Sequence, residues 1–196
     1  MVSHALLRAA LSLESGNDPA SWIFEINAFG KPFLAKTKQE GSQLFNLSHT
    51  EQLVAVAIGQ DAMLGIDVEC TSRTDLTLEL AQEFFSEEEL AFVAALPITC
   101  QRQSLFDFWT LKESYIKAIG QGLTIPLDTF AFALGNGQVP PHLIRKADQY
   151  DSLSNWHFRH FRPTPIHAMA LAVGMVSSQQ PLTVVCQEAH WLLNFC

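Results

Sequence analysis

The segment covering residues 104–119 is apolar on almost every side when it is read as a helix. Its large apolar side chains leave no continuous polar face: Leu105, Phe106, Phe108, Trp109, Leu111, Tyr115, Ile116 and Ile119. A helix that is hydrophobic all round is usually buried, because any side left in water would expose apolar surface. The rest of the chain must therefore cover this helix, and we expect it to lie at the centre of the fold.

Three charged side chains lie within six residues of this apolar helix: Lys112, Glu113 and Lys117. Glu113 and Lys117 are four residues apart and share a face, whereas Lys112 lies about 100° further round the axis. Charged side chains are rarely buried unless they are paired or bind a ligand. Two interpretations remain open: an ion pair within the helix between Glu113 and Lys117, or a cleft that the helix lines.

A second group of charges closes a predicted strand at residues 64–69. Asp67 and Glu69 are two residues apart, so in a strand their carboxylates point to the same face. Carboxylates that share a site repel each other, and a convergent acidic cluster therefore favours a bound cation. Oxygen ligands suit Mg²⁺, which completes its shell with water and substrate phosphate. The alternative is that both carboxylates face solvent at the end of the strand.

Hydrophobic periodicity predicts further elements around these two groups. Helices are expected at residues 4–13 and 76–85, and another after Ser86, where Glu89 completes a capping box. Strands are expected at residues 22–26, 44–48, 53–58, 64–69, 130–134, 156–161, 168–173 and 183–186.

The order of these elements repeats. A helix and three strands precede residue 64, and a strand, helices and further strands follow from it. We therefore expect an α+β fold of two pseudo-symmetric lobes, each a small, mainly antiparallel sheet packed on helices. The first lobe, residues 1–62, lacks the opening strand of the second, residues 63–196, and the active cleft is expected between them.

Composition narrows the classes of function. Hydrophobic residues make up 48% of the 196 residues, which is enough for a sizeable core. The net charge of −8 argues against a general nucleic-acid binder. Four cysteines without paired spacing are expected to be reduced, buried thiols. No run is long enough to span a bilayer and the first residues lack a signal-peptide layout, so we expect a soluble, cytoplasmic protein.

Five ordered stretches resemble the Sfp-type 4'-phosphopantetheinyl transferases over roughly residues 1–175. A lone Asp-x-Glu motif is weak evidence for this family. Five stretches in the family's order, ending in Trp-x-x-Lys-Glu-x-x-x-Lys, are strong evidence for it. They are Gly30-Lys31-Pro32, Phe45-Asn46-Leu47-Ser48-His49-Thr50, Gly65-Ile66-Asp67-Val68-Glu69, Phe84-Phe85-Ser86, and Trp109 through Lys117 with Gly120-Gln121-Gly122-Leu123.

This resemblance implies an enzyme that moves the 4'-phosphopantetheine group of coenzyme A onto a serine of an apo acyl or peptidyl carrier protein, releasing 3',5'-ADP. It implies that Asp67, Glu69 and Glu113 hold Mg²⁺ against the diphosphate, and that Lys112 and Lys117 neutralise phosphate charge. Glu113 is the candidate base for the carrier serine, directly or through a water. Lys117 is the candidate to protonate or stabilise the departing phosphate.

The resemblance also implies that Lys31, Ser48 and His49 meet the 3'-phosphate end of the nucleotide. Each has an ordinary interpretation beside this one. His49 is also what a packed histidine at a strand end looks like, Ser48 also suits a turn, and Lys31 before a proline also suits a solvated loop.

Two other functions fit the same residues. A metal-dependent nucleotide phosphohydrolase would use the same acids and lysines with water as the nucleophile. The other possibility is a truncated, weakly active or non-catalytic relative that still binds carrier protein. The resemblance suggests truncation because family members have further residues before the helix expected at residues 4–13.

Overall fold

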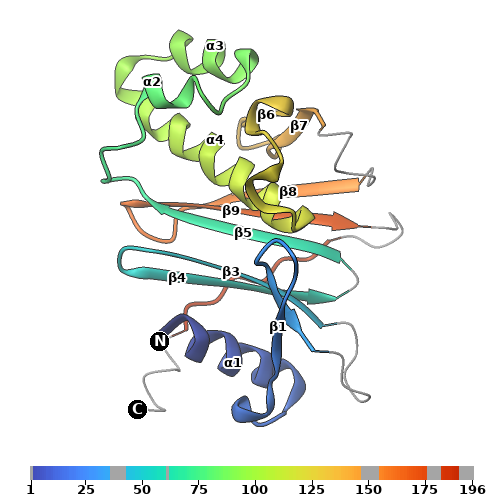
Figure 1. The fold of residues 1–196 in the computed structure, drawn as a ribbon. Helices are drawn as coiled ribbons and strands as arrows, with labels where there is room; N and C mark the ends of the chain where they lie inside the picture. Colours follow the sequence, from blue (N-terminus) through green and yellow to red (C-terminus); the bar gives the residue numbers. More distant parts are fainter. Residues whose placement is uncertain (1, 36–42, 61, 147–154, 176–181, 190–196) are drawn as a thin grey trace.

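The computed structural model describes residues 2–35, 43–60, 62–146, 155–175 and 182–189. A three-stranded sheet lies across the middle of the molecule, with the N-terminal helix and hairpins on one side and the long helix on the other (Figure 1). The fold is α+β, with small antiparallel sheets packed on helices, and this prediction from the sequence is confirmed.

The described residues before position 62 form a helix and two antiparallel hairpins. Helix α1 (Val2–Ser15) packs against the hairpin of β3 (Gln43–Thr50) and β4 (Leu53–Gln60). Strands β1 (Phe24–Ile26) and β2 (Pro32–Leu34) form the other hairpin, and a 3-10 turn, η1 (Pro19–Ser21), precedes it. The apolar residues buried between these elements are Leu7, Leu11, Trp22 and Phe45.

The central sheet has the order β5-β9-β8, with both pairs antiparallel. Its strands are β5 (Ala62–Cys70), β8 (Asn155–Phe161) and β9 (His167–Met175). Alternate positions of β9 face opposite sides of the sheet. The fully buried alanines belong to the core around the long helix, and their small side chains let that helix lie close to the sheet: Ala168, Ala170 and Ala172. The opposite face packs against β4 through Leu64, Ile66, Val68, Met169, Leu171 and Val173.

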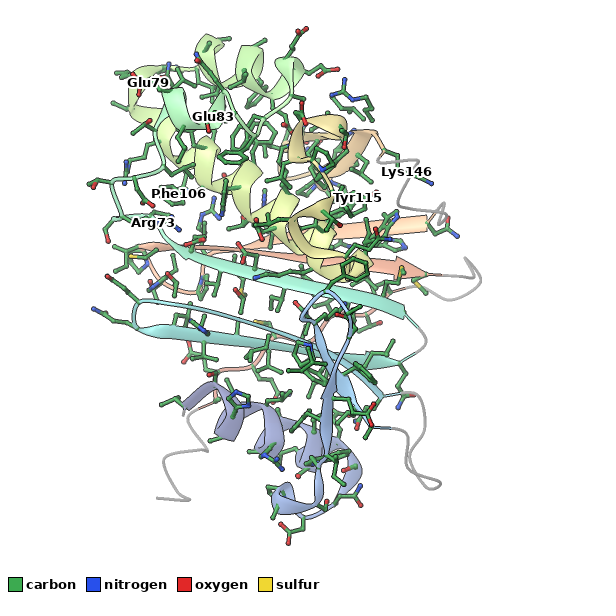
Figure 2. The ribbon with its side chains drawn as sticks, in the orientation of Figure 1. Arg73, Glu79, Glu83, Phe106, Tyr115 and Lys146 are labelled. Carbon is green, nitrogen blue, oxygen red and sulfur yellow. The ribbon has the colours of Figure 1, made fainter. Side chains whose placement is uncertain are left out.

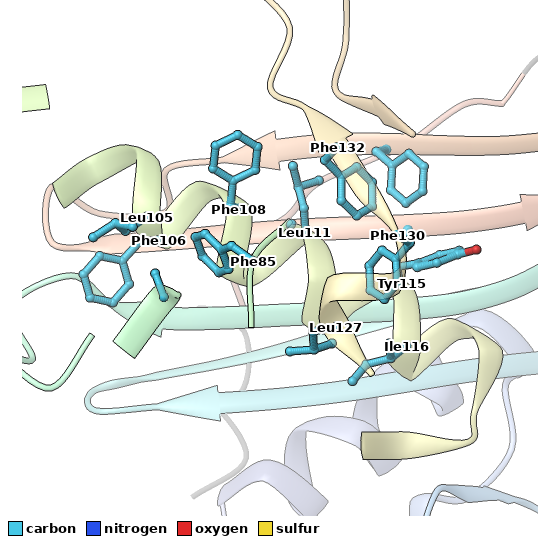
Figure 3. Packing of buried hydrophobic residues seen from close by; sticks show 14 of the residues in the cluster. Phe85, Leu105, Phe106, Phe108, Leu111, Tyr115, Ile116, Leu127, Phe130 and Phe132 are labelled. Carbon is cyan, nitrogen blue, oxygen red and sulfur yellow. The ribbon is translucent and has the colours of Figure 1, made fainter. Parts of the chain in front are cut away.

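The long helix α4 (Ile98–Ile119) is buried at the centre, as its apolar sequence predicts. Aromatic side chains surround it edge to face, including Tyr115 with Phe130 at 4.9 Å between ring centroids. Figure 3 shows these rings packed along the helix. The helix ends at Gly120, whose φ of 83° closes a left-handed C-cap that residues with a side chain rarely adopt.

Short elements cover the outer side of α4. They are α2 (Leu78–Ala81), α3 (Glu87–Ala95), the 3-10 turns η2 (Gly122–Thr124) and η3 (Leu127–Thr129), and the hairpin of β6 (Ala131–Ala133) with β7 (His142–Arg145). The capping box of Ser86 and Glu89 at the start of α3 is confirmed. No described helix is both long enough and apolar enough to cross a bilayer.

Three local predictions are wrong. The helix expected at residues 76–85 shrinks to one turn, α2, and residues 183–186 form no strand. Among the described cysteines only Cys70 is buried, whereas Cys100 and Cys186 are exposed; none of these three is in a disulfide, and Cys196 lies outside the described residues. The short strands β2 and β7 were not expected, because three or four residues carry little periodicity.

Candidate active site

Strand β5 and helix α4 touch backbone to backbone at Gly65. A Cβ atom at this position would lie 1.9 Å from the carbonyl oxygen of Ser114 and 2.5 Å from the amide nitrogen of Ala118. Only glycine therefore fits here, and its lack of a side chain brings the strand against the helix. This contact places Asp67, two residues along β5, beside the last turn of α4.

Asp67, Ser48 and Lys117 form one hydrogen-bonded group. The Lys117 ammonium lies 2.6 Å from Asp67 Oδ1 and donates to Ser48 Oγ at 3.0 Å. Ser48 in turn donates to Asp67 Oδ1 at 3.0 Å and accepts from the Val68 amide at 3.3 Å. The Ser48 hydroxyl has one proton and two lone pairs, so its bonding capacity is used up. The structure thus brings together three residues from β3, β5 and α4.

The second oxygen of Asp67 lies outside this hydrogen-bonded group. Asp67 is 3% exposed, and its Oδ2 atom is buried without a hydrogen bond among the described residues. An unsatisfied buried acceptor is costly, and a functional role or a bound ion is a standard explanation for one in a native protein. The orphan carboxylate oxygen fits a cation, and a hard oxygen donor of this kind fits Mg²⁺.

Glu113 faces this same group. Burial raises the pKa of its carboxyl to about 7, and the negative charge of Asp67 adds to the rise. Lys117 opposes the rise and Glu69 contributes to it. The charges of Asp67 and Glu69 therefore both act on Glu113, whose carboxyl is poised to exchange a proton near neutral pH.

The three acids are nevertheless not assembled into one ligand set. Among the residues described, no three Asp, Glu, His or Cys side chains gather closely enough to hold a metal ion. Glu69 pairs instead with Arg73, at 2.6 Å between Oε2 and Nη1. Arg73 lies just beyond the end of β5, where Figure 2 labels it. In this arrangement Asp67 pairs with Lys117 and Glu69 pairs with Arg73, so the two carboxylates of β5 have different cations as partners.

The structure places Lys112 in the interior, away from Asp67. Its side chain is 0% exposed, and the ammonium lies 2.8 Å from Glu89 Oε2. It also donates to the carbonyl oxygens of Leu127 at 2.7 Å and Phe130 at 2.9 Å. Burial lowers the pKa of Lys112, and the neighbouring Glu89 charge opposes that shift. With three partners for its three protons, Lys112 has no donor left for phosphate.

Lys31 also differs from the expectation. Its ammonium donates to the carbonyl oxygens of Lys117 at 2.6 Å, Ala118 at 3.1 Å and Leu64 at 3.2 Å. Burial lowers its pKa to about 8. A cation is favourable at the C-terminus of a helix, where carbonyls have no intrahelical partners. Lys31 therefore caps α4 and donates to three backbone carbonyls in this structure.

His49 is exposed on β3, and strand alternation turns it away from the group that contains Ser48. Two residues that the sequence analysis missed lie on the Ser48 side instead. Asn46 and Thr50 flank Ser48, and the three side-chain oxygens accept the amides of Ile66 at 2.8 Å, Val68 at 3.3 Å and Cys70 at 3.2 Å. The sequence signal for this row of side chains is the polar residue at every second position from Asn46 to Thr50.

The sequence profile of the 4'-phosphopantetheinyl transferase superfamily matches residues 63–174. The chain is 39% identical over 108 residues to the 4'-phosphopantetheinyl transferase gsp of Aneurinibacillus migulanus, covering 55% of this chain and 42% of that protein. It is 29% identical over 189 residues to the 4'-phosphopantetheinyl transferase Sfp of Bacillus subtilis (strain 168), covering 96% and 79%. The chain spans about half the length of the first curated relatives it matches.

Among solved structures, a holo-(acyl-carrier-protein) synthase from Bacillus anthracis str. Ames in complex with CoA (3',5'-ADP) has a TM-score of 0.49 with this chain. The sequence identity is 20%, over 58% of this chain and 96% of that one.

The range that matches the profile covers more than half of the 196 residues. It contains Asp67, Glu113 and Lys117, and therefore the contact between β5 and α4. The resemblance to Sfp-type transferases is confirmed, and the chain belongs to the 4'-phosphopantetheinyl transferase superfamily.

Proposed function

We propose that this protein transfers the 4'-phosphopantetheine group of coenzyme A to a serine of an apo acyl or peptidyl carrier protein, with Mg²⁺, and releases 3',5'-ADP. Family membership supports the class of reaction, since relatives along 96% of the chain carry the name 4'-phosphopantetheinyl transferase. The observation that carries the proposal is the buried Oδ2 of Asp67, which has no hydrogen-bond partner in the described part of the chain and lies near Lys117 and Glu113.

Asp67 and Glu113 are the residues that would hold Mg²⁺, with Glu69 joining them once its carboxylate leaves Arg73. When bound, the ion would neutralise charge on the diphosphate of coenzyme A. The motif residues supply hard oxygen donors, which is the ligand chemistry that Mg²⁺ prefers. We propose that this site lies in the cleft between the two predicted lobes.

The reaction makes one bond and breaks one. The carrier serine oxygen bonds to the phosphorus that bears the pantetheine arm, and the bond from that phosphorus to the oxygen of the departing 3',5'-ADP breaks. Glu113, with a pKa of about 7, would accept the serine proton directly or through a water. Lys117 would stabilise the negative charge that collects on the departing phosphate. His49, exposed on the other face of β3, remains a candidate contact for the 3'-phosphate end of the nucleotide.

The test is incubation with apo carrier protein, coenzyme A and Mg²⁺, followed by the intact mass of the carrier. We expect a gain of one phosphopantetheine group, and a loss of at least about 100-fold in rate for Asp67→Asn, because electrostatic contacts of this kind contribute several kcal/mol to catalysis. Glu79→Gln, at an exposed position on α2, is the control and should retain the rate.

The other two functions are distinguished in the same experiment. Loss of nucleotide without a gain in carrier mass would indicate a phosphohydrolase, and a carrier that binds without either change would indicate a non-catalytic relative.

We also propose a cytoplasmic location, which rests on the unpaired thiols of Cys70, Cys100 and Cys186.

A further inference from the structure

A buried ion pair lies on the side of α4 away from the sheet. Lys112 comes from the middle of the helix and Glu89 from the first turn of α3, and both side chains are 0% exposed. Their charged atoms are 2.8 Å apart. Removing one partner of such a pair leaves an uncompensated charge in the protein interior, which is strongly destabilising.

Glu89 uses both of its oxygens on other parts of the chain as well. Oε2 accepts the amide of Ser86 at 2.9 Å and Oε1 accepts the amide of Phe132 at 2.9 Å. Lys112 meanwhile holds the carbonyls of Leu127 and Phe130. The pair therefore joins the start of α3 and the segment leading into β6 to one position on α4.

Aromatic rings enclose the ammonium group. The Lys112 nitrogen lies 4.5 Å from the ring centroid of Phe130 and 5.8 Å from that of Phe85. A phosphate group at this nitrogen would have to displace Glu89 or a backbone carbonyl and leave it without a partner, which costs more than the contact returns.

The position of Lys112 fixes how α4 is turned on its axis. Glu113 follows Lys112 by about 100° of rotation and shares its face with Lys117. Lys117 contacts Asp67 on the sheet side. Anchoring Lys112 to Glu89 on the outer side therefore turns Glu113 and Lys117 toward β5.

We propose that Glu89 and Lys112 are positioning residues, a buried ion pair that holds α4 in the rotation at which Glu113 and Lys117 face Asp67. Lys112 does not contact the phosphates of the substrate. The kinetic part of the test below rests on the proposed transferase function, whereas the stability part does not.

The stability test uses Glu89→Gln, Lys112→Met and the double variant, each unfolded with urea. Glu89→Gln in the wild-type background leaves a buried ammonium without its counter-charge and should lower the urea midpoint. In the Lys112→Met background the same change removes an unpaired buried carboxylate and should raise it. This reversal of sign is the expected result. If Lys112→Met does not fold, the same prediction applies to the recovered fraction of folded protein in the double variant.

An exposed ion pair one residue away supplies the matched control. Glu88 on α3 pairs with Arg145 on β7 at 2.9 Å, with both side chains nearly half exposed. Glu88→Gln and Arg145→Met should each shift the midpoint little, and the effect of Glu88→Gln should not change sign in the second background. A Glu89→Gln effect of the same sign in both backgrounds would overturn the proposal.

The kinetic test measures the affinity for coenzyme A by titration and the rate of carrier modification. We expect the Lys112→Met/Glu89→Gln variant to bind coenzyme A within about threefold of the wild type while kcat falls at least about tenfold, since misplaced catalytic groups slow the chemical step. Binding weakened about tenfold or more with kcat retained would identify Lys112 as a phosphate ligand and refute the proposal. A wild-type protein without transferase activity but with the sign reversal would refute only the proposed function.

Discussion

At the scale of single residues, the carboxyl of Glu113 has a strongly raised pKa. Its pKa rises from 4.5 to about 7 because the carboxyl is buried and lies near the negative charge of Asp67. Between these two pH values the unfolded chain has lost this proton and the folded protein retains it. The folded state then binds more protons, so its stability falls as the pH rises through this window.

This shift predicts a pH-dependent effect of Glu113→Gln. The variant has no carboxyl to ionise, so in a metal-free buffer it should gain about 2–3 kcal/mol of unfolding free energy relative to the wild type between pH 4.5 and pH 8. Urea unfolding at both pH values measures this gain. A difference between the two proteins that does not change with pH would contradict the assignment, and Glu79→Gln provides a comparison at an exposed site.

At the scale of elements, the contact of β5 with α4 decides whether the site forms. Gly65 is the point of closest approach, and the atoms that a Cβ would meet belong to the helix backbone, which cannot move aside as a side chain can. Lys117 is within 2.6 Å of Asp67 only because the two backbones lie this close.

Gly65→Ala should therefore destabilise the protein by about 3 kcal/mol or more, since overpacking against rigid backbone separates the two elements. Gly59→Ala is the control, because its Cβ would meet only the flexible end of Leu64, at 3.0 Å. We expect a change of less than about 1 kcal/mol there. Urea midpoints that fall equally in both variants would show that the close contact at Gly65 is not the cause.

At the scale of the whole molecule, the N-terminal elements join the central sheet through side chains rather than through a continuous ladder of backbone hydrogen bonds. One edge of β5 pairs with β9, and the backbone groups of the other edge form hydrogen bonds with side chains of the N-terminal elements. The groups that serve this second edge are the Lys31 ammonium at Leu64 and the oxygens of Asn46, Ser48 and Thr50 at Ile66, Val68 and Cys70. Ser48 belongs to this row and to the candidate active site.

Thr50 offers a clean test of this row. Thr50→Val keeps the shape and removes the oxygen that accepts the Cys70 amide, so hydrogen exchange at Cys70 should accelerate about tenfold or more. Thr50→Ser keeps the oxygen and should leave the exchange rate near that of the wild type. The Asp67 amide, which alternation turns toward β9, should not change in either variant. Faster exchange at both amides would indicate general destabilisation instead.

Much of the fold could be predicted because its signals are local. The helix at residues 104–119, the capping box of Ser86 with Glu89 and the alternating strands all depend on neighbours within a few positions. The expected strand at residues 183–186 shows the limit of such signals, because a β-branched run forms a strand only where another strand is available to pair with it.

The sequence alone determined which charges share a face: Asp67 with Glu69 through the period of a strand, and Glu113 with Lys117 through the period of a helix. Only the tertiary structure decided which partner each charge meets. Asp67 meets Lys117, Glu69 meets Arg73, and Lys112 meets Glu89. The reason is physical: these pairings depend on the rotation of α4 against β5 and α3, and that rotation is set by packing between segments far apart in the chain.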